Sequence, residues 1–118
     1  MRHRERESRA LNSGFVCAVD VGTGSARAGI LDATGRLLGR AEHPIAMNRP
    51  RPDHAEHDSE DIWTAVCAAV RAARGKAGVA ASDVAGISFD ATCSLVVRDR
   101  DGGQLGVSTD GDPRWDTI

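Results

Sequence analysis

A short segment rich in glycine and hydroxyl residues, Asp20 to Arg27, stands between two runs with the pattern of β-strands. The first run, Phe15 to Val19, is continuously apolar and is typical of a buried strand. In the second run, Ala26, Ala28 and Ile30 occupy every other position, which is the period of a strand. Because only a few residues separate the two runs, the chain must fold back there, and the pattern predicts a β-hairpin.

The turn of this hairpin offers groups that suit a phosphate. Gly22 and Gly24 let the backbone approach an anion and take unusual dihedral angles. Thr23 and Ser25 add hydroxyl donors, and Arg27 adds a fixed positive charge. The P-loop motif is absent, and a dinucleotide fingerprint would need a third glycine at position 27, followed by a helix. On spacing alone, a β-turn that simply favours small and hydroxyl residues remains an equal alternative.

Asp20 is the unexpected member of this segment, because a carboxylate beside phosphates repels them. A bridging Mg²⁺, bound directly or through its water shell, removes the conflict. The pattern therefore favours binding of a metal–nucleotide complex over binding of a bare anion, with Asp20 as the metal residue.

Further strands are expected directly after the hairpin and again after residue 83. Arg36 to Glu42 forms a plausible third strand, so that the chain opens with a meander of strands. Val84 to Phe89 and Leu95 to Val97 are also strand-like. Asp101 to Gly103 is typical of a turn between strands.

One helix is expected between these groups of strands, after a proline-rich loop. Asp58 or Ser59 provides the N-cap, with acidic residues in the first turn, and Gly75 and Gly78 end the helix. Trp63, near its start, is expected to serve packing. Apolar residues repeat at helical spacing, namely Ile62, Val66, Ala69, Val70 and Ala73.

Length and composition exclude several classes of protein. The 118 residues suffice for one small domain, and a net charge of −2 argues against a nucleic-acid surface. No apolar run approaches the about 20 residues that span a bilayer. Residues 1–13 are dense in charge and are predicted to form a disordered tail. The three cysteines lack a CxxC pair, which indicates reduced thiols in a cytoplasmic protein.

Three segments, taken in order, resemble one family. Asp20 to Arg27 resembles the first phosphate motif of FGGY carbohydrate kinases, which have the actin/hexokinase-like (ribonuclease H-like) ATPase fold. Glu56 to Trp63 resembles the acidic stretch that begins the first long helix of that family. Gly86 to Leu95 resembles the sugar-site strand and turn of its ribulokinase-like branch. The resemblance covers the chain from about Gly14 and implies an α/β fold with a mixed sheet, opened by a β-meander and flanked by a helix.

The resemblance also implies roles for individual residues. Relatives often have Gln where this chain has His57, so that contact is not carried over. Glycerol kinases have an Arg-Glu pair where this chain has Ala91 and Thr92, which disfavours glycerol as the substrate. The implied residues are Asp20 near the metal ion, Thr23, Gly24, Ser25 and Arg27 at the ATP phosphates, and Asp90, Ala91, Thr92 and Cys93 at the sugar.

The implied reaction is transfer of the ATP γ-phosphoryl group to a sugar hydroxyl, most favourably that of a pentulose such as ribulose, with ATP and Mg²⁺. The family's catalytic Asp is expected beyond Ile118. Residues 14–118 are therefore interpreted as a partial N-terminal domain, truncated and inactive by itself. We expect no nucleic-acid or membrane partner, and the full-length protein is compatible with a homo-oligomer.

Other interpretations of single residues are weaker. His54 and His57 lie three apart, but no further ligand joins them to complete a zinc site. Cys93 has no paired histidine that would make it a nucleophile. Asp90 has the alternative of a solvent-facing turn cap. For the whole chain, the alternatives are a nucleotide-binding module of the same superfold without sugar chemistry and a non-catalytic remnant.

Overall fold

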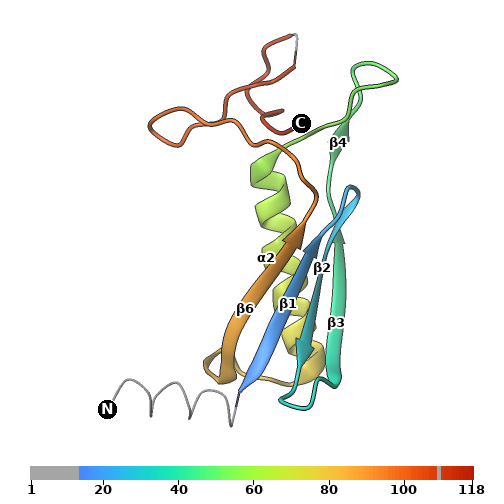
Figure 1. Cartoon of the computed structure of the whole chain (residues 1–118), viewed down its shortest axis with the longest axis vertical. Coiled ribbons are helices and arrows are strands. Elements are labelled where there is room, and N and C mark those ends of the chain that lie inside the picture. The colour runs from blue at the N-terminus through green and yellow to red at the C-terminus, as the bar shows by residue number, and fades with distance from the viewer. Residues whose placement is uncertain (1–13, 109) are drawn as a thin grey trace.

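The structure is a computed structural model that describes residues 14–108 and 110–118. The charged tail predicted at residues 1–13 lies outside the described residues. Four strands form one mixed sheet in the order β3-β2-β1-β6, and helix α2 lies across one face of it (Figure 1). The strands of this sheet are β1 (Phe15–Val21), β2 (Ser25–Leu31), β3 (Leu37–Pro44) and β6 (Val84–Ala91).

The expected meander is confirmed. β1 pairs with β2 and β2 pairs with β3, both antiparallel, whereas β6 returns through α2 to pair parallel with β1. The third strand is displaced by one or two residues from the predicted range Arg36 to Glu42, because the turn before it includes Arg36. In that turn the Asp32 carboxylate accepts the N–H groups of Thr34 and Arg36, and Gly35 has a φ of 82°.

Helix α2 (Ser59–Ala77) begins and ends as its sequence predicts. The Asp58 carboxylate accepts the N–H groups of Glu60 and Asp61, and Gly78 closes the helix with a φ of 65°. Gly75, the other predicted end, lies inside the helix. Trp63 is 58% exposed, so the expectation that it serves packing is wrong within the described residues.

Small residues hold α2 close to the sheet. Alternate residues of β1 and β2 face the helix, which lays its alanines and Val66 against them. Gly39 of β3 allows the closest approach, because a Cβ atom there would lie 2.4 Å from the Ala73 carbonyl oxygen and 2.6 Å from the Ala77 nitrogen. The core of buried apolar residues is Cys17, Val19, Ala26, Ala28, Ile30, Ala41, Ile45, Ala65, Val66, Ala69, Ala73 and Val79.

The first strand is buried on one face only. Cys17 and Val19 face α2, whereas Val16 is 45% exposed on the other face. The prediction of a buried strand therefore holds for one face of β1 only. A continuous apolar run does not reveal how many layers cover a strand.

Three short elements complete the structure. β4 (Met47–Asn48) pairs antiparallel with β5 (Glu56–His57), and the 3₁₀-helix η1 (Ala81–Asp83) leads into β6. No helix among the described residues has both the length and the apolar character needed to cross a bilayer.

The chain after β6 differs from its prediction. Leu95–Val97 is not a strand, because its pairing with Asp116 to Ile118 amounts to one isolated bridge, between Val96 and Thr117, and its other described backbone bond joins the Val97 carbonyl to the Leu105 N–H. The Leu95 N–H donates to the Ile118 carbonyl at 2.8 Å, and the Val97 N–H donates to that of Asp116 at 2.8 Å. The predicted turn that follows is confirmed, with Gly102 at a φ of 84°.

The close contact at Gly39 predicts a stability difference between two glycines. Gly39→Ala should lower the free energy of unfolding by about 1–3 kcal/mol, because its Cβ meets backbone atoms of α2 that cannot rotate away. Gly86→Ala in β6 is the matched control, since its Cβ would find nothing within 4 Å. Urea unfolding measures both, and an equal effect of the two substitutions would contradict the packing described here.

Candidate functional site

The turn between β1 and β2 is the hairpin that the sequence predicts. The Gly22 N–H donates to the Ser25 carbonyl at 2.9 Å, and a strand rather than a helix follows. Neither Gly22 nor Gly24 has a positive φ, so the expectation of unusual dihedral angles is wrong. Gly22 instead provides space, because a Cβ atom there would lie 3.3 Å from Nη2 of Arg27.

The two carbonyl groups at the tip of this turn each accept a hydrogen bond from a residue outside the turn. The Thr23 carbonyl accepts a hydrogen bond from Nε2 of His57 at 2.7 Å, and the Gly24 carbonyl accepts one from the Ile45 N–H at 3.0 Å. Thr23 and Gly24 are both exposed. Within residues 14–108 and 110–118, their N–H groups have no hydrogen-bond partner. The tip therefore presents two backbone donors.

A row of charged residues crosses the sheet beside the turn. Asp90, Asp20, Arg27 and Glu42 are successive partners in the register of β6, β1, β2 and β3. Their neighbours along each of β1 and β2 are buried under α2, so the row lies on the opposite face of the sheet. Arg27 is the one cation of the row. Its Nη1 lies 2.8 Å from Oδ2 of Asp20, and its Nε lies 3.6 Å from Oε1 of Glu42.

Ser25 and Glu42 are joined below the tip. The Ser25 side chain is buried, and its hydroxyl donates to Oε1 of Glu42 at 2.6 Å. This hydrogen bond, helped by the charges of Arg27 and Arg40, lowers the pKa of Glu42. The hydroxyl of Ser25 is thus engaged within the hairpin, whereas Thr23 and Gly24 lie at its exposed tip. Contact of these residues with a phosphate stays a prediction.

The residues expected at the sugar lie at the same edge of the sheet. Asp90 is the last but one residue of β6, beside Asp20 in the parallel pair. Thr92 continues from β6 and donates its N–H to the Val21 carbonyl at 3.2 Å, and Cys93 is exposed. An open groove of about 420 Å³ lies on this face, and Asp20, Arg27 and Asp90 line part of it. The turn, the end of β6 and the start of α2 all lie at the upper end of the sheet in Figure 1.

Two carboxylates, Asp20 and Asp90, could hold a cation at this edge. Mg²⁺ typically binds one or two carboxylates and completes its shell with water and substrate phosphates, so this donor set fits it. Among the described residues, no three His, Cys, Asp or Glu side chains gather as a metal site. The His54 ring lies 3.0 Å from Oδ1 of Asp53, while the His57 ring points to the hairpin.

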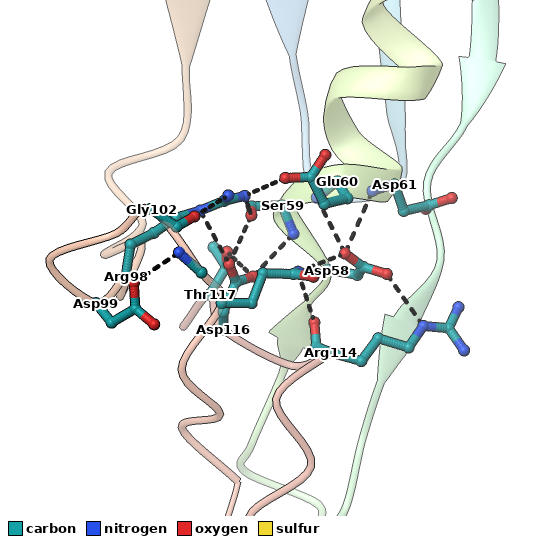
Figure 2. Close-up of polar contacts among 12 residues, drawn as sticks. Asp58, Ser59, Glu60, Asp61, Arg98, Asp99, Gly102, Arg114, Asp116 and Thr117 are labelled. Atoms are coloured by element: carbon teal, nitrogen blue, oxygen red, sulfur yellow. Dashed lines mark hydrogen bonds and ion pairs between the residues drawn. The ribbon is translucent and has the colours of Figure 1, made fainter.

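The segment after β6 is attached to the start of α2 through polar contacts (Figure 2). Asp116 is completely buried and accepts hydrogen bonds from the N–H of Ser59 at 2.9 Å and from its hydroxyl at 2.6 Å. Arg98 contacts the Ser59 hydroxyl, lies 2.7 Å from Glu60 and is 3.6 Å from Asp116. Arg114 lies 3.1 Å from Asp58. Two further bonds join the backbones of His57 and Thr117.

The electrostatics of this attachment favour ionised carboxylates. Burial by itself raises the pKa of Asp116, but the hydrogen bonds from Ser59 and Thr117 outweigh it, so that the pKa lies below its ordinary value. Burial likewise opposes ionisation of Asp58. Hydrogen bonds from Gln104, Arg114 and the first turn of α2 outweigh it and lower the pKa of Asp58.

Three residues that position the site were missed by sequence reasoning. His57, Glu42 and Asp116 each contact a partner at least 17 positions away in the chain. Neither the zinc interpretation of His57 nor its difference from relatives predicts its bond with Thr23. Only the pairing of Arg27 with Glu42 in neighbouring strands could have been inferred, from the alternation of the meander.

Comparisons with known proteins agree with this geometry. Residues 15–108 match the N-terminal domain of the FGGY family of carbohydrate kinases. The chain is 41% identical over 104 residues to a human FGGY carbohydrate kinase domain-containing protein, covering 88% of this chain and 18% of that protein. It is 48% identical over 83 residues to a D-ribulokinase of Saccharomyces cerevisiae, covering 70% of this chain and 12% of that protein.

Among solved structures, a xylulose kinase from Rhodospirillum rubrum superposes with a TM-score of 0.67 and 25% identity, over 75% of this chain and 18% of that one. The expected actin/hexokinase-like fold is confirmed by this likeness. The chain spans less than a fifth of the length of each of these three proteins.

The environment of Asp116 predicts a pH dependence of stability. Its folded-state pKa lies below the ordinary value of 3.8, so the ionised group stabilises the fold above that pH, and this contribution is lost as pH falls through the lower folded value. Asp116→Asn should therefore lower the urea midpoint at pH 7 and reduce the loss of midpoint between pH 7 and pH 3. An unchanged m-value is the control. A variant with the pH dependence of the wild type would contradict the assignment.

Proposed function

Because the chain belongs to the FGGY family of carbohydrate kinases, we propose that its β1–β2 hairpin binds the phosphates of Mg²⁺–ATP for transfer of the γ-phosphoryl group to a sugar hydroxyl. The observation that carries the proposal is the exposed tip of the hairpin. Two backbone N–H groups there, those of Thr23 and Gly24, have no partner among the described residues and lie beside the charged row of Asp20 and Arg27. Backbone donors of this kind suit phosphate oxygens.

Each residue of the hairpin has a separate part in this proposal. Thr23 and Gly24 donate to phosphate oxygens from the tip. Arg27 places a permanent positive charge on the same face, where Asp20 and Glu42 fix its direction. Ser25 anchors the turn through Glu42, and its own phosphate contact would be made by the backbone or after the hydroxyl changes partner.

Asp20, with Asp90 beside it, would hold the Mg²⁺ ion, directly or through water. When bound, the ion neutralises phosphate charge during the transfer. The carboxylates of Asp20 and Asp90 keep that charge at the edge of the sheet where β1 and β6 both end.

The proposed acceptor is a pentulose such as ribulose. It is supported by the 48% identity to a D-ribulokinase and by the absence of the Arg-Glu pair of glycerol kinases at Ala91 and Thr92. Asp90, Ala91, Thr92 and Cys93 would contact the sugar from the end of β6. We also propose a cytoplasmic location, with which the free thiols of Cys17, Cys67 and Cys93 agree, and a homo-oligomeric full-length protein.

The role of Asp20 is tested by nucleotide binding. The chain should bind ATP more tightly with Mg²⁺ than with EDTA, and Asp20→Asn should weaken Mg²⁺–ATP binding by about tenfold, or 1.4 kcal/mol, while removing most of the Mg²⁺ dependence. Isothermal titration calorimetry measures both effects. Asp83→Asn is the matched control, because it removes the same charge just before β6 begins, at the opposite end of the strand. Equal weakening by both variants would show a general charge effect and contradict the proposal.

We further predict that the 118-residue chain alone does not turn over sugar. Phosphoryl transfer needs a base for the accepting hydroxyl, which the family resemblance places beyond Ile118. The groove beside Asp20 is also open to water. A coupled assay of ADP release with ATP, Mg²⁺ and D-ribulose should give the rate of the no-enzyme control. Ordinary turnover, in the range of about 1–100 s⁻¹ typical of kinases, would contradict this prediction.

A further inference from the structure

We propose that His57 is a positioning residue of the phosphate turn, which fixes the orientation of the Thr23–Gly24 peptide so that the Gly24 N–H faces the ligand. This inference rests on the proposed function and deepens it. Nothing in the family resemblance carries over to His57, since relatives often have Gln at this place. The role follows from one contact, the 2.7 Å hydrogen bond between Nε2 of His57 and the Thr23 carbonyl.

The direction of this hydrogen bond is determined by chemistry. A carbonyl oxygen only accepts, so Nε2 of His57 carries the proton and donates. The side chain of His57 is largely enclosed, and the residue is 7% exposed. Water therefore competes little for the bond, which is worth more in such surroundings than on an open surface.

The geometry of the peptide bond links the hydrogen bond from His57 to the direction of the Gly24 N–H. The Thr23 carbonyl and the Gly24 N–H belong to one planar trans peptide, in which the two groups point in opposite directions. Holding the carbonyl toward His57 therefore turns the Gly24 N–H away from His57, to the exposed side of the tip. Rotation of that peptide by half a turn would offer a carbonyl oxygen to the phosphates, and two electronegative groups would then face each other.

Such a rotation is a real alternative for this turn. The Thr23–Gly24 peptide is the central one of the four residues Gly22 to Ser25, whose ends are joined by the bond from the Gly22 N–H to the Ser25 carbonyl. In four-residue turns of types I and II, the two types differ mainly in the orientation of the central peptide. Glycine tolerates both orientations because it lacks a Cβ atom, and Gly24 has no atom within 4 Å of where a Cβ would stand. An outside contact is therefore needed to select one orientation.

His57 is well placed to make that selection because its own backbone is fixed. Its N–H donates to the Thr117 carbonyl at 2.9 Å, and the Thr117 N–H donates back at 3.1 Å. On its other side it pairs with Met47 in the β4–β5 ribbon, and the next residue, Asp58, caps α2. The imidazole is thus carried by the last residue of β5, directly before the N-cap of α2, rather than by an unpaired loop.

Two substitutions distinguish the hydrogen bond that His57 donates from the volume that its ring fills. His57→Met keeps an apolar side chain of comparable volume but cannot donate, whereas His57→Gln keeps an N–H donor. His54→Ala is the control for a neighbouring histidine, since the one hydrogen bond of the His54 ring among the described residues is with Asp53. We expect His57→Met to weaken binding of Mg²⁺–ATP by about tenfold, as for loss of one donor to a charged group. His57→Gln and His54→Ala should stay within about twofold of the wild type.

A second measurement determines the orientation of the Thr23–Gly24 peptide directly and needs no ligand. Residual dipolar couplings of the ¹⁵N-labelled chain report the direction of the Gly24 N–H vector, which should change in His57→Met and be retained in His57→Gln. Loss of binding in His57→Met with an unchanged Gly24 vector would assign His57 a merely structural part and overturn the inference. Binding by His57→Met equal to that of the wild type would also overturn it.

The two proposals fail in distinguishable ways. If the wild-type chain does not bind Mg²⁺–ATP, the proposed function fails for this chain, while the dipolar couplings still decide whether His57 orients the peptide. If His57→Met does not fold, the wild type provides the test: an imidazole without a proton on Nε2, or a Gly24 N–H directed toward His57, would overturn the inference.

Discussion

Three consecutive residues at the start of α2 connect the parts of this structure that the chain brings together from a distance. The His57 ring holds the hairpin turn, the Asp58 carboxylate caps the helix, and Ser59 donates twice to the buried Asp116. Each contact satisfies a polar group that would otherwise be costly to bury. Because the three residues are consecutive, the hairpin turn and the segment after β6 are attached to the same stretch of backbone.

The local elements could be predicted because their causes are local. The period of two in β2, the capping by Asp58 and the positive φ at Gly78 all depend on residues within one turn or strand. The turn between β1 and β2 belongs to the same class, since the Gly22 N–H donates to the carbonyl of Ser25, three residues later. Its exposed donors could also be anticipated, although not through unusual dihedral angles: neither glycine has a positive φ, and a Cβ atom at Gly22 would lie 3.3 Å from Nη2 of Arg27.

The remainder could not be predicted because it depends on partners far along the chain. Leu95–Val97 has the composition of a strand, but its pairing with residues 116–118 forms a single isolated bridge and not a continuous ladder. Trp63 has the character of a core residue, but it is 58% exposed in the first turns of α2. The first strand shows the same limit, since Val16 and Cys17 are equally apolar and only the position of α2 distinguishes them.

The charges on the open face of the sheet bear on which form of the nucleotide the hairpin can accept. Asp90, Asp20 and Glu42 place three carboxylates in one row, against two cations: Arg27 within the row and Arg40, which lies 3.8 Å from Glu42. The exposed N–H groups of the turn are neutral, so the row determines the sign of the local field. A bare triphosphate that approached the tip would meet a face with an excess of negative charge, whereas Mg²⁺ would be attracted to Asp20 and Asp90 and reverse that effect. In the proposed function, the turn thus supplies hydrogen bonds to phosphate oxygens, and the carboxylates of β1 and β6 supply the preference for the metal complex.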